Sequence, residues 1–174
     1  MEVVTIYGFL MTYWLDEYRV WQDIFPYNCS KKAVIPSNQL WIPDMVISNS
    51  EQLRLPRETD GIDIMIDSDG TSARSVSGTI TFYCPLNMAM FPFDVQTCSL
   101  IFDSWALDTT EQTFNIYGSG TRLVPGYESE EWDVTDFIIE IHQSTFGSSD
   151  YAKVSLFIQI FKIFFLYFIN FNQG

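Results

Sequence analysis

Basic residues are scarce in this sequence. It contains nine Lys and Arg against 22 Asp and Glu, and its formal net charge is -13. Proteins that bind nucleic acid neutralise phosphates with clustered Lys and Arg, and this chain has too few of them to form such a cluster. The sequence therefore argues against a nucleic-acid partner and favours a cationic one.

Residue patterns that hold metals or carry out catalysis are also missing. His142 is the only histidine, and neither Cys84 nor Cys98 has another cysteine or a histidine at zinc-ligand spacing. The sequence contains no nucleophile elbow, no zinc-protease motif, no phosphate-binding glycine loop and no catalytic Cys–His neighbourhood. The acidic stretch at 63–69 departs from the EF-hand order, so a solvated loop explains it better than a calcium site. We therefore predict no enzyme, no metal site and no cofactor.

The two ends of the chain differ in character. Residues 1–10 have Glu2 where a signal peptide carries basic residues, and no small-residue cleavage site, so we do not interpret them as a signal peptide. From Val154 onward nearly every residue is apolar, and the part after Lys162 is too short to cross a bilayer alone. We expect a strand that runs into an incomplete hydrophobic segment.

Alternating apolar and polar residues dominate the middle of the chain. In DVTDFIIEIHQ (133–143) most apolar residues fall on one face, opposite Glu140 and His142. The segments TITFYC (79–84), TCSLIF (97–102) and TFNIYG (113–118) show a similar pattern, and turn clusters such as DSDG and FGSSD separate the strands. The pattern predicts one all-β domain, an antiparallel β-sandwich, with no domain boundary before about Lys162.

Cys84 and Cys98 enclose thirteen residues that include two prolines. A disulfide here restricts the unfolded chain by about 3 kcal/mol in the chain-entropy model and implies an oxidising compartment. Two buried free thiols are the alternative. Asn28 opens the only N-x-[ST] sequence and is the predicted glycosylation site of a secretory protein. Cys29, within that sequence, has no assigned partner.

Several motifs occur together in a fixed order. The cysteine loop contains Phe91-Pro92-Phe93-Asp94 and is preceded by WLDEYRVW (14–21) and IPSNQLWIPDMVISNS (35–50). It is followed by Trp105 at a set spacing after Cys98, by EWDV (131–134) and by YFIN (167–170). Together they resemble the Cys-loop, pentameric neurotransmitter-gated ion channels, most closely the nicotinic branch.

The resemblance implies an architecture and a location. Residues 1–161 would be an extracellular ligand-binding β-sandwich without the family's N-terminal helix and first strand, and residues 162–174 would begin the first of its membrane helices. The subunit would form a pentamer with identical or sister subunits at the plasma membrane. The cysteine loop would lie near the membrane, where Phe91, Pro92, Phe93 and Asp94 couple ligand binding to gating.

Aromatic faces hold a cationic amine well, each with about 0.5 to 2 kcal/mol, so a cage of several rings is the chemistry to look for. By the resemblance, Trp105 and Tyr151 belong to the principal face of one subunit, and Trp14 to the complementary face of its neighbour. Phe146 is a further candidate for the principal face. Other residues of the same motifs are expected to brace loops and strands: Trp21, Trp41, Pro43, Asp44, Trp132 and Asp133.

Three departures from the acetylcholine-binding pattern bear on the ligand. Ser48 stands where acetylcholine-type principal faces carry a tyrosine, and residues 143–150 contain no adjacent cysteine pair. Ala73 and Ser75 are small where the complementary face adds side chains. We predict a receptor subunit for a small cationic ligand, with a cation pathway favoured by the acidic composition. The alternative is a soluble, acetylcholine-binding-protein-like protein without a pore.

Overall fold

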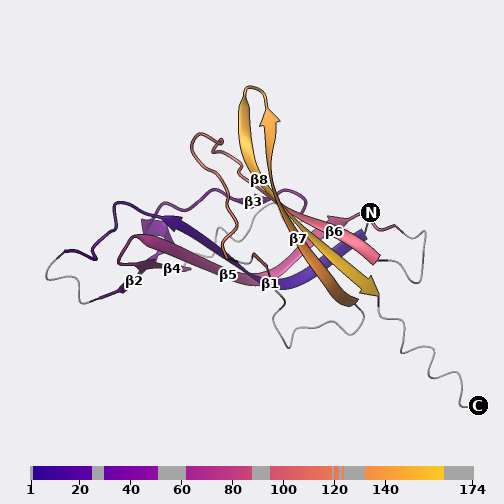
Figure 1. Cartoon of the computed structure of the whole chain (residues 1–174), viewed down its shortest axis with the longest axis horizontal. Helices are drawn as coiled ribbons and strands as arrows, with labels where there is room; N and C mark the ends of the chain where they lie inside the picture. Colours follow the sequence, from indigo (N-terminus) through magenta and orange to yellow (C-terminus); the bar gives the residue numbers. More distant parts are fainter. Residues whose placement is uncertain are drawn as a thin grey trace, which may run out of the picture.

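The computed structural model describes residues 2–24, 30–50, 62–87, 95–118, 120, 121, 123 and 132–162. These residues form two four-stranded sheets (Figure 1). The first sheet has the order β1 (Glu2–Leu15), β5 (Thr71–Cys84), β4 (Asp63–Asp67), β2 (Lys32–Pro36). The second has the order β3 (Val46–Ile47), β6 (Val95–Asp103), β8 (Ser149–Lys162), β7 (Trp132–Phe146). A short 3₁₀ turn at Ser37–Gln39 follows β2.

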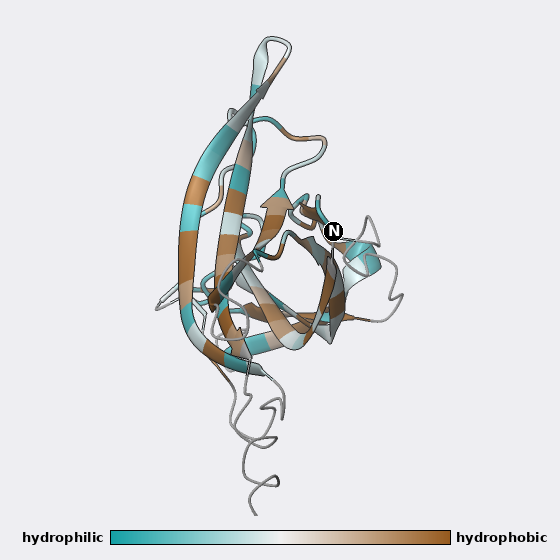
Figure 2. Cartoon of the chain, turned by 90° about the vertical axis from the view of Figure 1, so that its right-hand side faces the viewer, coloured by the Kyte–Doolittle hydropathy of each residue, from teal (hydrophilic) through white to brown (hydrophobic). Residues whose placement is uncertain are grey.

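Every neighbouring pair of strands is antiparallel, which confirms the predicted all-β antiparallel sandwich. The inward side chains of β5, β6 and β8 form the main core, in which Phe82, Leu100 and Ile158 are buried together with both cysteines. Because alternate residues of a strand point to opposite faces, hydrophobic and hydrophilic bands alternate along the long strands (Figure 2).

The β7–β8 hairpin extends beyond the rest of the sandwich (Figure 1). Phe146 pairs with Ser149, and Gly147 adopts a φ of +65° in the tight turn between them. The predicted alternation of β7 is interrupted by a bulge between Val134 and Asp136. The bulge changes the phase of the strand, so that Val134 and Phe137, three residues apart, both pack against the core.

The prediction of a strand at 113–118 is wrong, because this segment has no regular secondary structure. The buried side chain of Gln112 is bonded to the backbone of Asp44, and the ring of Tyr117 stacks on that of Tyr13 in β1. The segment thus passes from the second sheet toward the first instead of pairing with a neighbouring strand.

Several predicted features lie outside the described residues. They are the glycosylation site Asn28 with its neighbour Cys29, the proposed gating residues Phe91, Pro92, Phe93 and Asp94, and the apolar end of the chain at 163–174. In the part of the chain that the structure describes, no helix has the length and apolar character needed to cross a membrane.

Candidate functional site

Trp105 is presented by the turn that follows β6. Its side chain is 72% exposed. Its backbone N–H donates to Oδ2 of Asp44 at 2.8 Å, and the N–H of Ala106 donates to the same oxygen. The indole of Trp105 is therefore exposed, while the buried carboxylate of Asp44 fixes the backbone that carries it.

Asp44 is in turn fixed by Gln112. The N–H of Asp44 donates to Oε1 of Gln112 at 2.8 Å, and Nε2 of Gln112 donates to the carbonyl oxygen of Asp44. Both side chains are buried, so these bonds form where water does not compete for them. The loop-bracing role predicted for Asp44 is confirmed, whereas Gln112 was not identified from the sequence, because nothing local marks a partner 68 residues away.

Tyr151 lies on β8, the strand next to β6. Asp103, the last residue of β6, pairs with Lys153, and the N–H of Ser104 donates to the carbonyl oxygen of Ala152 at 2.9 Å. Continuing this register places Trp105, two residues after the end of β6, beside Tyr151 of β8 at the same end of the second sheet. Tyr151 is partly buried there.

Phe146 lies farther out, at the end of the β7–β8 hairpin. Its side chain is 81% exposed, and the hairpin carries it away from the sandwich. Thr145, beside it, donates its hydroxyl to Oδ1 of Asp150 at 2.6 Å and so ties the two strands near the turn. The hairpin presents an aromatic ring that its own chain does not bury.

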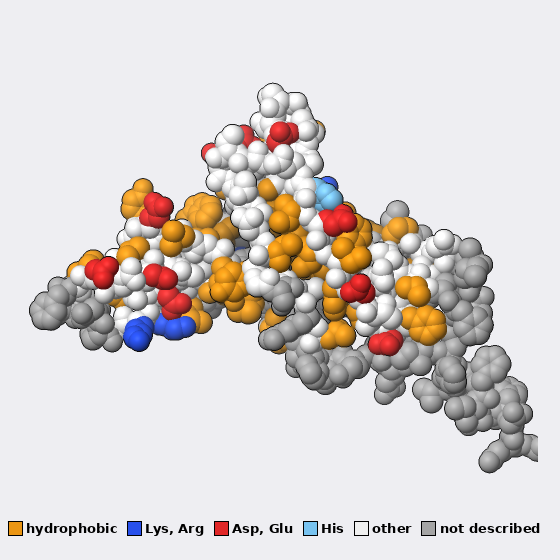
Figure 3. Space-filling model, viewed as in Figure 1, with side chains coloured by type: hydrophobic (Ala, Val, Ile, Leu, Met, Phe, Trp, Pro, Cys, Tyr) orange, Lys and Arg blue, Asp and Glu red, His pale blue; other side chains and the backbone are white. Residues whose placement is uncertain are grey.

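Two pairs of ionisable side chains lie near the base of this hairpin. Lys153 Nζ lies 3.6 Å from Oδ1 of Asp103, and His142 Nε2 lies 3.2 Å from Oε2 of Glu140. On the face seen in Figure 3, acidic side chains are spread along the molecule and basic ones are few. Such a surface attracts small cations rather than anions.

Asp108 adds a carboxylate to the loop after Trp105. Hydrogen bonds from the hydroxyl and then the backbone N–H of Thr110 hold the pKa of Asp108 below its ordinary value. A lowered pKa means that the anion stabilises this loop above the ordinary pKa, and that the stabilisation is lost as the pH falls through the lowered one. The loop therefore keeps this negative charge throughout the neutral range.

A shallow hollow of about 440 Å³ adjoins the Trp105 turn. It lies between the loop after β2 and the residues Ala106 and Leu107, and the half-exposed Trp41 is one of the residues that line it. Asp44 also lines it, so the residue that fixes the Trp105 backbone borders this hollow.

Trp14 lies on the packed face of β1. It pairs with Ser72 of β5, which pairs with Ile66 of β4, and both partners are fully buried. Directly paired residues share a face of the sheet, so the ring of Trp14 points to the side of its own chain's interior. Its assignment to a ligand contact stays a prediction.

The opposite face of β1 carries an aromatic row that sequence analysis missed. Tyr7, Phe9 and Met11 are each about half exposed, and the rings of Tyr7 and Phe9 meet edge to face at a centroid distance of 5.9 Å. The period-2 spacing of these residues in IYGFLMTYW marks them as a set opposite Trp14. Each can offer a ring or a sulfur atom to a partner outside the chain.

Two of the three departures have structural counterparts. Ser48 is exposed beside β6, where its N–H donates to the carbonyl oxygen of Ile101 at 3.0 Å. Ala73 and Ser75 of β5 lie directly opposite Tyr13 and Met11 of β1. Their small side chains leave this part of the outward face uncovered.

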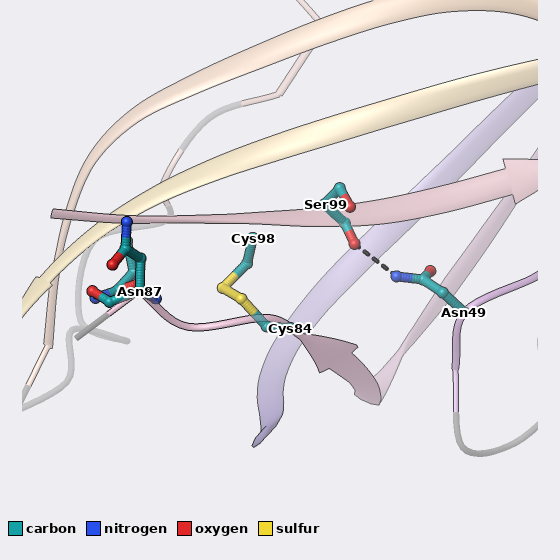
Figure 4. Close-up of a disulfide and its surroundings, with 6 residues drawn as sticks. Asn49, Cys84, Asn87, Cys98 and Ser99 are labelled. Carbon is teal, nitrogen blue, oxygen red and sulfur yellow. Dashed lines mark hydrogen bonds between the residues drawn. A yellow bond between two sulfur atoms is a disulfide. The ribbon is translucent and has the colours of Figure 1, made fainter. Parts of the chain in front are cut away.

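The predicted disulfide is confirmed: Cys84 and Cys98 are bonded, with their Cα atoms 5.2 Å apart (Figure 4). The bond joins the end of β5 to β6 and so ties the two sheets inside the core. Near the disulfide, the side-chain amide of Asn49 donates to the carbonyl oxygen of Ser99 and accepts a hydrogen bond from the N–H of Ile101. These two bonds hold the segment after β3 against β6. The bond excludes the alternatives of free thiols and a zinc site for these two cysteines.

Comparisons with known proteins agree with this arrangement. A sequence model of the neurotransmitter-gated ion-channel ligand binding domain matches residues 1–162. The acetylcholine receptor subunit alpha-type acr-5 of Caenorhabditis elegans is 24% identical over 92% of this chain and 28% of its own length. The neuronal acetylcholine receptor subunit alpha-6 of Rattus norvegicus is 30% identical over 71% of this chain and 24% of its own length.

A third relative, ligand-gated ion channel 4 of Caenorhabditis elegans, is 26% identical over 84% of this chain and 23% of its own length. The chain thus spans about a quarter of the length of the curated relatives that it matches. The family match covers all the described strands, the cysteine loop and the Trp105 turn. This chain is a member of the neurotransmitter-gated ion-channel ligand-binding domain family, of the Cys-loop, nicotinic-like type.

Proposed function

We propose that this chain is the ligand-binding domain of a subunit of a pentameric neurotransmitter-gated ion channel, and that a small cationic ligand binds between subunits in an aromatic cage. The observation that carries this proposal is the exposed indole of Trp105 on a backbone fixed by Asp44. A backbone that is already in place reduces the ordering entropy lost on binding, and the face of the indole attracts a cation.

The principal side of the cage is formed by Trp105 and Tyr151, with Phe146 closing from the hairpin. The position of Trp105 in the turn after β6, next to Tyr151 on the adjacent strand β8, supports this assignment. The exposed ring of Phe146 has no packing role that would hold it within its own chain. Ligand binding would favour a hairpin position that brings Phe146 closer, and the sandwich would pass this bias to the pore.

The complementary side comes from the β1 strand of a neighbouring subunit. Trp14 is the residue expected from the motif resemblance, and the outward row at Tyr7, Phe9 and Met11 is a second candidate on the same strand. The exposure of that row supports it, because a half-exposed apolar row on one strand face is typical of an interaction surface. A site divided between two sides requires at least two subunits.

The remaining parts of the proposal concern the whole receptor. Residues 1–161 would lie outside the cell, residues 162–174 would begin the first membrane segment, and Phe91, Pro92, Phe93 and Asp94 would couple binding to gating. Asn28 would carry a glycan. The acidic composition would concentrate cations near a pore and favour cation selectivity.

A soluble ligand-binding protein of the same fold is the alternative. The apolar run after Lys162 distinguishes the two, because in a soluble protein it would form an exposed apolar patch that promotes aggregation. Fractionation of cells that produce the natural full-length protein separates them: extraction only by detergent supports the receptor, and release into buffer supports the soluble protein.

The binding site is tested with the full-length receptor in cells, with acetylcholine and tetramethylammonium as probe cations and responses corrected for surface level. Trp105→Ala should raise the half-maximal concentration by roughly 30-fold or more, as for a hot-spot residue. Trp132→Ala, in a residue packed against the core, should instead lower the surface level. An unchanged response with Trp105→Ala would remove Trp105 from the site and leave the proposed cage without its main ring.

A further inference from the structure

Tyr117 stacks on Tyr13 of β1. The ring centroids are 4.3 Å apart and the planes differ by 22°. The hydroxyl of Tyr13 lies 3.6 Å from the sulfur of Met11, two residues along the outward face of the same strand. A residue of the loop after β6 is therefore part of the surface formed by the outward row of β1.

The other end of the same loop carries Trp105. Between the two, Gln112 is fixed by its pair of hydrogen bonds to the backbone of Asp44, whose carboxylate accepts the N–H of Trp105. Direct contacts thus lead from Trp105 through Asp44 and Gln112 to within five residues of Tyr117.

The chain after Tyr117 fixes this residue from the other side. Gly118 and Gly120 have φ angles of +61° and +78°, and the N–H of Gly120 donates to the carbonyl oxygen of Tyr117 at 3.2 Å. A Cβ atom on Gly120 would lie 2.6 Å from Cδ1 of Ile139 in β7, so the backbone passes directly over that strand. Gly120 thus lies against β7 of the second sheet, and three residues before it the ring of Tyr117 lies against β1 of the first.

We propose that Tyr117 is a positioning residue that links the Trp105 turn to the outward face of β1 within one subunit. The inference rests on the proposed function, in which these are the principal and complementary sides of two different ligand sites. A ligand that shifts the Trp105 turn would move the segment at 112–117 and change the surface at Tyr13 and Met11. By linkage, a ligand at the β1 surface would act on Trp105 to the same extent.

The small residues opposite this surface support the assignment. Ala73 and Ser75 lie across from Tyr13 and Met11, and larger side chains there would compete with Tyr117 for the face of β1. Both tyrosines are accessible, with Tyr117 71% exposed, so the stack can rearrange without opening the core. A contact of this kind suits a link that must change between two ligand states.

The physical link is tested first, by NMR of the complete chain with ¹³C-labelled methionine methyl groups. Tyr117→Ala should shift the Met11 methyl resonance, because the stacked ring that positions Tyr13 is lost, and Tyr117→Phe should restore it. Gln112→Leu, at the other anchor, should shift the same resonance. Tyr18→Ala is the matched control, since Tyr18 follows β1 in sequence and is 98% exposed.

The functional link is tested in the full-length receptor with acetylcholine as the probe. Tyr117→Ala should raise the half-maximal concentration by about 2- to 10-fold, the range of one aromatic pair, while Tyr117→Phe and Tyr18→Ala leave it unchanged. In the double variant Trp105→Phe/Tyr117→Ala, the change in half-maximal concentration, expressed as a free energy, should differ from the sum of the two single changes, because the effects of coupled residues are not additive.

If Tyr117→Ala folds normally and the Met11 methyl resonance does not shift, the link is overturned. Additive effects of Trp105→Phe and Tyr117→Ala on the half-maximal concentration also overturn it. If acetylcholine and tetramethylammonium responses ignore every Trp105 variant, the proposed function fails and this inference fails with it. Weakened responses with Trp105 variants, together with additivity, reject the inference alone and leave the proposed function standing.

Discussion

The carboxylate of Asp44 and the backbone N–H of Trp105 are hydrogen-bonded at 2.8 Å although 61 residues separate them. One oxygen of Asp44 also accepts the N–H of Ala106, and the whole carboxylate is buried. The turn that presents Trp105 is thus set by a side chain from a different loop. A charged acceptor away from water makes strong bonds, and its removal leaves buried donors without partners.

Asp44→Ala should therefore lower the free energy of unfolding by about 2 to 4 kcal/mol, because two backbone N–H groups lose a charged acceptor. Asp44→Asn keeps one carbonyl oxygen in the same place and should cost roughly half as much. Urea unfolding of the complete chain measures both. Equal stability of Asp44→Ala and the parent chain would show that the bonds add nothing.

The disulfide should contribute on a similar scale. Cys84→Ala/Cys98→Ala should lower the free energy of unfolding by about 3 kcal/mol, the loop-closure term for a bridge between residues 14 apart in sequence. The pair also fills space in the core, which adds to the loss. Peptide mass spectrometry without reductant checks the bond itself, and two free thiols in the folded chain would contradict it.

The fold was predictable from the sequence where a pattern is local. Alternation marked the segments now seen as parts of β5, β6 and β7, and the spacing of Cys84 and Cys98 marked the disulfide. Long-range side-chain contacts were not predictable. Alternation at 113–118 indicated a strand, but Gln112 is bonded to Asp44 and Tyr117 is stacked on Tyr13, and these contacts override the local preference.

The candidate site divides in the same way. Trp105 and Asp44 each lie in a sequence motif, so each could be identified as a candidate from the sequence alone. The side of the strand to which Trp14 points depends on its pairing with Ser72, and pairing is set by partners far along the chain. The alternating spacing of Tyr7, Phe9 and Met11 shows in the sequence that they share one face of β1. Which of the two faces of β1 is exposed is known only from the packing of the other face against the core.

Two glycines provide a matched pair for backbone effects. Gly70 and Gly147 both have positive φ, at 89° and 65°, so alanine at either costs about 1 to 2 kcal/mol in conformation alone. A Cβ atom on Gly70 would also lie 2.6 Å from the carbonyl oxygen of Asp16, whereas one on Gly147 would meet nothing within 4 Å.

Gly70→Ala should therefore be the more destabilising, by at least about 1 kcal/mol, because relief of the clash requires the backbone to move. The affected contact is the one at which the N–H of Asp16 donates to the carbonyl oxygen of Gly70 and ties the end of β1 to the β4–β5 turn. Thermal unfolding of the two variants gives the difference. A larger loss with Gly147→Ala would mean that the hairpin turn, not the β4–β5 turn, is the more constrained.

The two faces of β1 allow its structural and ligand-binding roles to be separated. Trp14 shares the packed face with Ser72 and Ile66, so Trp14→Ala should lower the free energy of unfolding by about 2 kcal/mol or more through lost packing. Phe9 is 53% exposed on the other face, so Phe9→Ala should cost less than about 1 kcal/mol of stability.

In the full-length receptor, Phe9→Ala should nevertheless weaken the acetylcholine response by roughly 3- to 10-fold, because a ring facing the neighbouring subunit contributes to the ligand site from one side. Thr5→Ala, on the same outward face, is the control for a general effect of substitution there. A weakened response with Trp14→Ala at normal stability and surface level, and none with Phe9→Ala, would instead assign the complementary ring to Trp14 and require its side chain to turn outward in the assembled receptor.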